Sequence, residues 1–274
     1  MRRVLFAATT GLAATIALGF LVLPLIAIFA QVPPGRLLGQ LGNPVARDAL
    51  LVSLKTSLIA HALVLLFGTP TAYLLARRRF PGRAAVLTLI ELPLVLPPAV
   101  AGIGLLAAFG RVGLLGDELS AFGIQIPFTQ TAVVLAVAFV ESPFYLRGAI
   151  AAFEGVDSRL VAAAKTLGAG PWLVFGRVAL PLAGAGLGAA SAVALARGLG
   201  EFGATIIFAG SLQGVTQTLP LAIYAEFEQD FDVALAIGAL FILVCAAILV
   251  SVKAFGWARS SSTFAFRPAA STSS

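Results

Sequence analysis

Residues 233–256 read VALAIGALFILVCAAILVSVKAFG, with one charged side chain, Lys253, near the end. A helix needs about 20 predominantly apolar residues to cross the hydrocarbon core of a bilayer. This stretch has that length. Its central part, 240–250, does not alternate between polar and apolar residues as the strands of a membrane β-barrel do. The stretch therefore predicts a transmembrane helix.

Five further stretches of the same kind precede it, at residues 4–30, 49–76, 84–109, 129–153 and 182–202. Lipid offers no hydrogen-bond partner to open backbone groups, so each span is expected to be a helix. The predicted fold class is all-α: a polytopic membrane protein with six transmembrane helices in one domain over residues 1–259, followed by a solvated tail at 260–274. Arg2 and Arg3 precede the first span as they would a signal peptide, but its apolar length favours an uncleaved helix.

The composition supports a membrane protein. Hydrophobic residues make up 59% of the 274 residues and charged residues 11%, and the mean hydropathy is +1.02. Soluble domains carry about 25% charged residues, so an ordinary soluble enzyme is excluded, and disorder requires low hydrophobicity. The single cysteine, Cys245, and the single histidine, His61, exclude an internal disulfide and a Cys/His metal cluster. We expect no metal site.

Lysine and arginine are distributed unevenly between the segments that join the spans. Cytoplasmic segments of membrane proteins carry the excess of these residues. If the N-terminus is cytoplasmic, the outer segments hold only Arg36, Arg47 and Arg111. We therefore expect a chain in the cytoplasmic (inner) membrane with both termini in the cytoplasm, and no nucleic-acid binding despite the net charge of +6. The inner segments hold Arg2, Arg3, Arg77, Arg78, Arg79, Arg83, Arg147, Arg159, Lys165, Arg177, Lys253, Arg259 and Arg267.

The loop between the fourth and fifth spans, residues 154–181, reads EGVDSRLVAAAKTLGAGPWLVFGRVALP. Asp157 or Ser158 is suited to cap a short helix, Gly168 stands where its C-terminal cap is expected, and Pro171 is suited to open a second short helix. The first helix would carry an apolar face of small and leucine residues. Such a face either docks into a groove on a partner protein or lies on the membrane surface. The face comprises Leu160, Ala163, Ala164 and Leu167.

This loop resembles the cytoplasmic motif of ABC importer permeases, which runs Glu-Ala-Ala, three residues, Gly, nine residues, Ile, one residue, Leu-Pro. Ala162 replaces the Glu, and Val178 replaces the Ile. The resemblance implies a coupling helix seated on a separate ATPase subunit, and an exposed ion pair lost with the Glu is worth only about 0–1 kcal/mol. The residues implied in coupling are Ala163, Ala164, Lys165, Leu167, Gly168 and Pro181.

Four other stretches are similar to the molybdate permease subunits of this family: ELPLVLPPAVAGIGLL (91–106), PFYLRGAI (143–150), ARGLGEFGATIIFAGS (196–211) and TQTLPLAIY (216–224). Sulfate and tungstate permeases share parts of them. The resemblance implies a homodimer of the permease, two cytoplasmic ABC ATPase subunits and an extracytoplasmic molybdate-binding protein. No Gly-Lys dipeptide occurs, so a Walker A loop is absent. We therefore expect no cofactor on this chain, with ATP and magnesium bound by the ATPase subunit.

Ionisable residues inside the spans are the candidate functional groups, because each is costly at the bilayer centre. Glu141 and His61 either have a structural role, partnered by helix-interior hydroxyl groups or by each other, or line the pathway. Arg197 and Glu201 are four residues apart and can pair on one helix face. Gly203 and Gly210 would allow the chain to break beside them. The residues expected to flank the translocation path and its outer gate are Arg197, Glu201, Gly203, Thr205 and Glu141; the alternative is a clamp between helices.

Three other patterns yield expectations about the helices. Pro93, Pro97 and Pro98 predict a kinked or discontinuous third span. Gly184 and Gly188 form a GxxxG pair that favours close helix packing, within the subunit or across a dimer. Arg147 is expected to pair with Glu91.

The outer loop before the last span is acidic, with Glu226, Glu228, Asp230 and Asp232. These residues form either a contact surface for a soluble partner or a solvated loop.

The predicted function is that of a non-enzymatic permease subunit of an ATP-driven molybdate importer. The alternatives are a permease for tungstate or sulfate, or an ion-coupled secondary transporter in which Glu141 and His61 relay protons.

Overall fold

The computed structural model describes residues 2–33, 35, 39 and 42–264, and all regular secondary structure in these ranges is helical. Among the described residues, five helices are long and apolar enough to cross a membrane, and the number rises to six if one bent helix pair is counted as a single span. The all-α, polytopic prediction is therefore confirmed. Most of the predicted tail, residues 265–274, lies outside the described residues, whereas 260–264 continue the last helix. The five long helices are α1 (Arg2–Gln31), α3 (Pro44–Arg77), α7 (Gln130–Glu154), α10 (Leu180–Leu199) and α13 (Phe231–Phe264).

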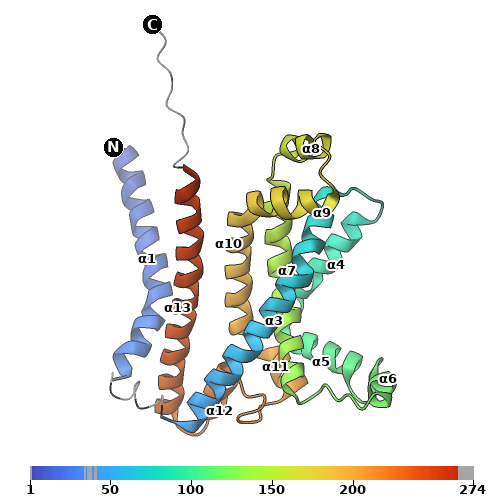
Figure 1. The fold of residues 1–274 in the computed structure, drawn as a ribbon. Coiled ribbons are helices and arrows are strands. Elements are labelled where there is room, and N and C mark those ends of the chain that lie inside the picture. The colour runs from blue at the N-terminus through green and yellow to red at the C-terminus, as the bar shows by residue number, and fades with distance from the viewer. Residues whose placement is uncertain (1, 34, 36–38, 40–41, 265–274) are drawn as a thin grey trace.

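The third span is broken, as its prolines predicted. It consists of α4 (Arg83–Val95) and α5 (Pro98–Phe109), which meet at an angle of 116°. Proline has no amide hydrogen to donate and its ring clashes with the preceding turn, so the helix cannot continue through Pro97 and Pro98. Figure 1 shows α5 turning away from the bundle towards α6 (Gly116–Ala121).

Side chains at the helix ends explain where several helices begin. Asn43 Oδ1 accepts a hydrogen bond of 2.9 Å from the amide of Val45, and Pro44 occupies the first turn of α3. The hydroxyl of Thr129 accepts one from the amide of Ala132 at the start of α7. Such side chains satisfy amides that have no partner within the helix.

The core is formed by α3, α7 and α10, which lie side by side in the centre of the bundle (Figure 1). The helices α7 and α10 approach closely because Gly148 faces Ala190 and Gly186 faces Ala152; a Cβ at either glycine would lie 2.6 Å from the facing Cβ. Gly184 and Gly188, in contrast, have no described atom within 4 Å of such a Cβ. The described residues therefore make no close contact with the predicted GxxxG pair, and the opposite face of α10 packs on α7.

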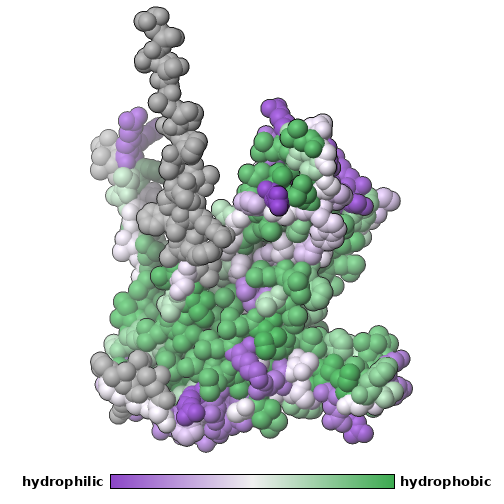
Figure 2. Space-filling model, in the orientation of Figure 1, coloured by the Kyte–Doolittle hydropathy of each residue, from purple (hydrophilic) through white to green (hydrophobic). Residues whose placement is uncertain are grey.

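Figure 2 shows a hydrophobic band around the middle of the molecule, with hydrophilic residues gathered towards its two ends. Leucine, isoleucine and phenylalanine side chains of α1 are exposed along much of its length. In Figure 1, α1 stands beside α13 at the edge of the bundle. These exposed apolar faces match the environment of a bilayer, where the surrounding lipid is apolar.

Candidate functional site

The segment between α7 and α10 forms a compact tip at one end of the bundle, where α8 projects in Figure 1. It consists of α8 (Ser158–Thr166), α9 (Pro171–Val174) and the π-helical turn η1 (Phe175–Ala179). Asp157 Oδ1 accepts a 2.8 Å hydrogen bond from the amide of Arg159, so Asp157 caps α8. Gly168 has a backbone φ of +85°, a left-handed conformation that residues with a side chain rarely adopt. Both caps and the opening Pro171 agree with the sequence-based expectation.

Two valines anchor this segment in the core. Val161 of α8 and Val174 of α9 are buried in the same hydrophobic cluster as Phe153 of α7 and Ala179 of η1. Because η1 leads directly into α10, the segment is packed against the helix that follows it. A displacement of α8 would therefore act on α10 through packed side chains as well as through the chain itself.

The outward side of the same segment is apolar and exposed. Leu167 is 88% exposed and Trp172 is 82% exposed, and Leu160 and Leu173 are exposed beside them in the sequence. We call these four residues the coupling patch. Exposed apolar patches of this kind mark surfaces that contact a protein partner or a membrane. Sequence reasoning included Leu160 and Leu167 but missed Trp172, whose signal is an aromatic residue directly after a helix-opening proline.

The other residues predicted for coupling lie on or near this patch in the sequence. Ala163, Lys165 and Gly168 are exposed and Ala164 is half-buried. Pro181 is exposed in the first turn of α10, beyond η1. Five of the six residues thus belong to α8 and its C-terminal turn, while Pro181 marks where the following span begins.

Arg197 and Glu201 form a pair at the opposite end of α10. Arg197 Nη1 lies 3.0 Å from Glu201 Oε2, and the guanidinium stands 6.0 Å from the ring centre of Phe144. The pair does not lie on one helix face as expected, because α10 ends at Leu199 rather than continuing to 202. Glu201 lies beyond the helix, and its Oε1 accepts a 2.7 Å hydrogen bond from the amide of Ala204.

That hydrogen bond holds the first turn of α11 (Gly203–Ala209), a helix too short to cross a membrane. Gly203 lies against α5: a Cβ at this position would be 2.6 Å from Pro98 Cβ. Thr205 is fully buried, and its hydroxyl has no hydrogen-bond partner among the described residues. The chain leaves α11 at Gly210, with φ +68, before α12 (Leu219–Phe227). The structure thus groups Arg197, Glu201, Gly203 and Thr205 at the junction of α10, α11 and α5.

Glu141 belongs to a second, buried polar cluster. Glu141 Oε1 contacts His61 Nδ1, and His61 Nε2 lies 2.8 Å from Ser191 Oγ, so the cluster joins α7, α3 and α10. Glu141 is fully buried. A Cβ on Gly198 would lie 2.7 Å from Glu141 Oε2, which places the carboxylate directly against the residue after Arg197. The sequence left open whether Glu141 and His61 pair with each other or with helix-interior hydroxyl groups. The structure shows both kinds of contact, but Ser191, a single hydroxyl in a run of small residues, was not singled out from the sequence.

One further predicted contact is present. Arg147 Nε lies 3.3 Å from Glu91 Oε1, as expected.

In the loop before α13, the predicted acidic residues Glu228, Asp230 and Asp232 are exposed and Glu226 is half-buried. Asp230 Oδ1 accepts hydrogen bonds from the amides of Asp232 and Val233, so it caps α13.

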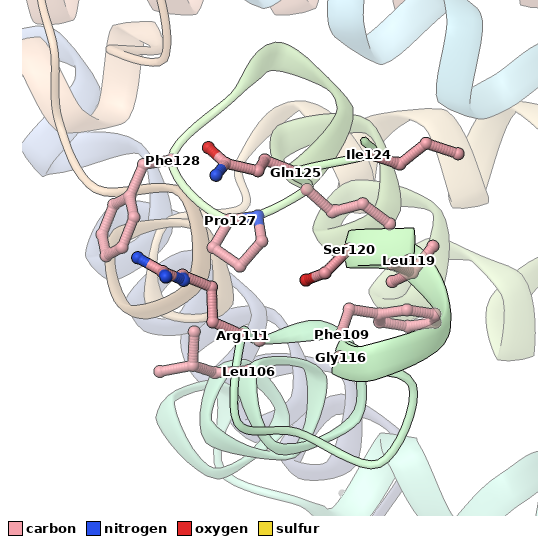
Figure 3. A pocket seen from close by; sticks show the side chains of 12 residues that line it. Leu106, Phe109, Arg111, Gly116, Leu119, Ser120, Ile124, Gln125, Pro127 and Phe128 are labelled. Atoms are coloured by element: carbon pink, nitrogen blue, oxygen red, sulfur yellow. The ribbon is translucent and has the colours of Figure 1, made fainter. Parts of the chain in front are cut away.

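A pocket of about 230 Å³ lies beyond the C-terminal end of α5, and none of the predicted site residues lines it. Figure 3 shows Arg111 between Leu106 and Phe128 along one side of this pocket, with Phe109 and Leu119 on the other. Its walls are largely apolar, with Ser120 and Gln125 as further polar members. The candidate path residues and this pocket are therefore separate features.

Residues 68–259 match the family model described as "Binding-protein-dependent transport system inner membrane component". The chain belongs to this family. It is therefore a multi-pass membrane protein and a permease component rather than an enzyme. The family match includes α8, the coupling patch, the Arg197–Glu201 pair and α11. Of the buried polar cluster it includes Glu141 and Ser191, whereas His61 precedes the matched residues.

Individual relatives agree with the family. The chain is 48% identical over 238 residues to the molybdenum transport system permease protein ModB of Mycobacterium tuberculosis, covering 86% of this chain and 89% of that protein. It is 35% identical over 237 residues to the sulfate transport system permease protein CysW of Synechocystis, covering 85% of each. A chain in the crystal structure of a bacterial alginate ABC transporter shares the fold, with a TM-score of 0.70 over 92% of this chain and 93% of that chain, at 19% identity.

Proposed function

We propose that this chain is the membrane-spanning subunit of an ATP-driven importer that moves molybdate across the cytoplasmic membrane. The observation that carries the proposal is the 48% identity to a molybdenum permease, which extends over most of both chains. The similarity to a sulfate permease is lower, at 35% over a comparable length. Molybdate is therefore favoured over sulfate, and tungstate, a tetrahedral dianion of the same kind, is the second candidate.

We assign the coupling patch to the contact with a cytoplasmic ATPase subunit. The patch is apolar, exposed and held by a segment whose other side is anchored in the core by Val161 and Val174. A groove on the partner would bury Leu167 and Trp172, and each large apolar side chain buried contributes about 1.5–3 kcal/mol. ATP and magnesium belong to that partner, which closes on ATP and moves α8. The excess of lysine and arginine at this end of the bundle supports a cytoplasmic location for this end and for both termini.

We assign the path to a homodimer in which the open face of α10 packs against a second copy. Gly184 and Gly188 have no described neighbour on this face, and glycine pairs at this spacing favour close helix contacts in membranes. The motion of α8 would be transmitted through η1 and α10 to Arg197 and Glu201. There the arginine supplies a positive charge to the oxyanion that an extracytoplasmic binding protein delivers. Glu201 neutralises that charge, so the path holds the anion weakly, as a path must.

The test is reconstitution of the chain with its ATPase and binding protein in sealed vesicles. We expect uptake of labelled molybdate that requires ATP and is outcompeted by tungstate but poorly by sulfate. Uptake driven by an ion gradient without ATP would instead indicate a secondary transporter. Equal uptake of sulfate would assign the chain to the other oxyanion.

The docking assignment has its own test. Leu167→Asp places a charge in the coupling patch, and Gly168→Asp forces a side chain into a backbone conformation that disfavours it. Both variants are expected to lose co-purification of the ATPase subunit. Arg159→Gln, on the same helix but outside the patch, is the matched control and should retain it. Normal co-purification of both patch variants would refute the assignment.

A further inference from the structure

A basic pocket lies where α3 ends and α4 begins. It has a volume of about 340 Å³ and is lined by Ala76, Arg77, Arg79, Arg83 and Glu154. Three guanidinium groups therefore face one carboxylate. This pocket belongs neither to the coupling patch nor to the proposed path, and nothing derived above uses it.

The three arginines are engaged to different degrees. Arg83 Nη2 lies 2.7 Å from Glu154 Oε1, and Arg83 Nε donates to the carbonyl of Leu75. Arg77 Nη2 donates to the carbonyl of Val156 at 3.0 Å, while its buried Nε has no partner among the described residues. Arg79 makes no hydrogen bond or ion pair with the part of the chain that the structure describes.

Glu154 balances only one of these charges, so the pocket keeps an excess of two positive charges over its single carboxylate. Guanidinium groups bind phosphate through paired N–H donors, and charged hydrogen bonds are about twice as strong as neutral ones. We propose that this pocket is a binding site for a phosphate-type oxyanion. Arg79 and Arg77 supply the free donors, and Arg83 is already held in place by Glu154.

The position of the pocket favours an anionic phospholipid as the source of that group. Arg77 is the last residue of α3 and Arg83 the first of α4, and the ends of transmembrane helices lie at the level of the lipid headgroups. Phe80, exposed between them, is suited to enter the interface, where aromatic side chains gather. Basic pockets at the cytoplasmic ends of helices bind anionic headgroups. Free phosphate offers the same chemistry without the acyl chains.

Occupancy of the site would affect the segment between α7 and α10, residues 155–179, which we call the coupling segment. Glu154 is the last residue of α7 and Val156 precedes α8, and both are held by arginines of the pocket. An anion between these arginines would stabilise the contact between the α3–α4 turn and the root of the coupling segment. This inference does not depend on the proposed molybdate transport.

The test measures lipid retention by the purified full-length chain in phosphatidylcholine bicelles, using native mass spectrometry. One arm adds phosphatidylglycerol, and a second arm adds inorganic phosphate instead. Arg79→Gln removes a free guanidinium from an exposed position and leaves the other contacts intact. Arg159→Gln removes one positive charge from the same end of the bundle, outside the pocket, and is the matched control.

We expect the native chain to retain phosphatidylglycerol, and Arg79→Gln to weaken that retention on the order of tenfold, the effect of one charged hydrogen bond. Arg159→Gln should retain it as the native chain does. Binding of phosphate alone, with the same dependence on Arg79, would support the site and assign a free oxyanion as its source. Absence of binding in both arms, or equal weakening by Arg159→Gln, would overturn the proposal.

Discussion

The close contact between Gly198 and Glu141 predicts that even one added methyl group disturbs the buried polar cluster. In Gly198→Ala the new Cβ would lie 2.7 Å from Glu141 Oε2 and 3.1 Å from Val137 Cγ1. Glu141 cannot simply withdraw, because its other oxygen contacts His61. Replacing glycine with alanine in a helix gains about 0.5–1 kcal/mol, whereas overpacking costs about 1–3 kcal/mol. The expected net loss is about 1–2 kcal/mol.

This loss is measured as the melting temperature of the purified chain in detergent. For a chain of this size, 1 kcal/mol corresponds to about 2–4 °C, so Gly198→Ala should melt roughly 2–8 °C below the native protein. Gly238→Ala, in α13, is the matched control because no described atom lies within 4 Å of its added Cβ. It should melt at the native temperature or above it.

A double variant isolates the cause. Glu141→Ala removes the carboxylate that the new methyl group would strike, so adding Gly198→Ala to it should lower the melting temperature little further. Contacting residues show such non-additivity, and distant ones do not. An equal decrease in both backgrounds, or no decrease in the native background, would refute the reasoning.

Three other predictions concern the remaining contacts. Arg197→Ala should reduce ATP-dependent uptake about tenfold or more in vesicles with correctly assembled complex, because Glu201 then presents an unbalanced charge; native uptake would remove Arg197 from the path. Gly184→Leu should shift the purified chain from dimer to monomer in size-exclusion chromatography with light scattering, and an unchanged dimer would exclude this face as the interface. Ser191→Ala leaves His61 Nε2 without its 2.8 Å partner. It should lower the melting temperature by about 2–12 °C, since an unsatisfied buried group costs about 1–3 kcal/mol; an unchanged melting temperature would show that this contact adds no stability.

The number and type of the spans could be predicted from the sequence because the bilayer leaves the backbone few choices. Helix starts such as those at Asp157 and Pro171 could be predicted as well, since a cap depends on neighbours along the chain. The break in the third span follows from Pro97 and Pro98. The angle of 116° does not, because it depends on how α5 packs against α11.

The end of the fifth span shows what local patterns miss. The predicted span continues to residue 202, yet the helix stops at Leu199 and the side chain of Glu201 caps the first turn of α11. Glu201 could either continue α10 or cap the start of α11, and it cannot do both. The contact of Gly203 with Pro98, about a hundred positions earlier in the sequence, favours the end of α10 before Glu201. The contact between Ser191 and His61 could not be predicted for a similar reason. It depends on the packing of α3 against α10, which joins residues far apart in the sequence.

The two polar clusters are joined through one short stretch of α10. Ser191 and Gly198 are seven residues apart, so both face the Glu141–His61 pair, while Arg197 beside them pairs with Glu201. A rotation or shift of α10 that moves Arg197 would therefore also change the contacts that Ser191 and Gly198 make with the buried His61–Glu141 pair. Because α10 starts at the coupling segment and ends at this arginine, the cluster sits where motion from one end would be resisted or transmitted. In this conformation the guanidinium of Arg197 is paired with Glu201. Under the proposed function, an oxyanion that reaches Arg197 would have to compete with this carboxylate, which would keep its binding weak and its release fast.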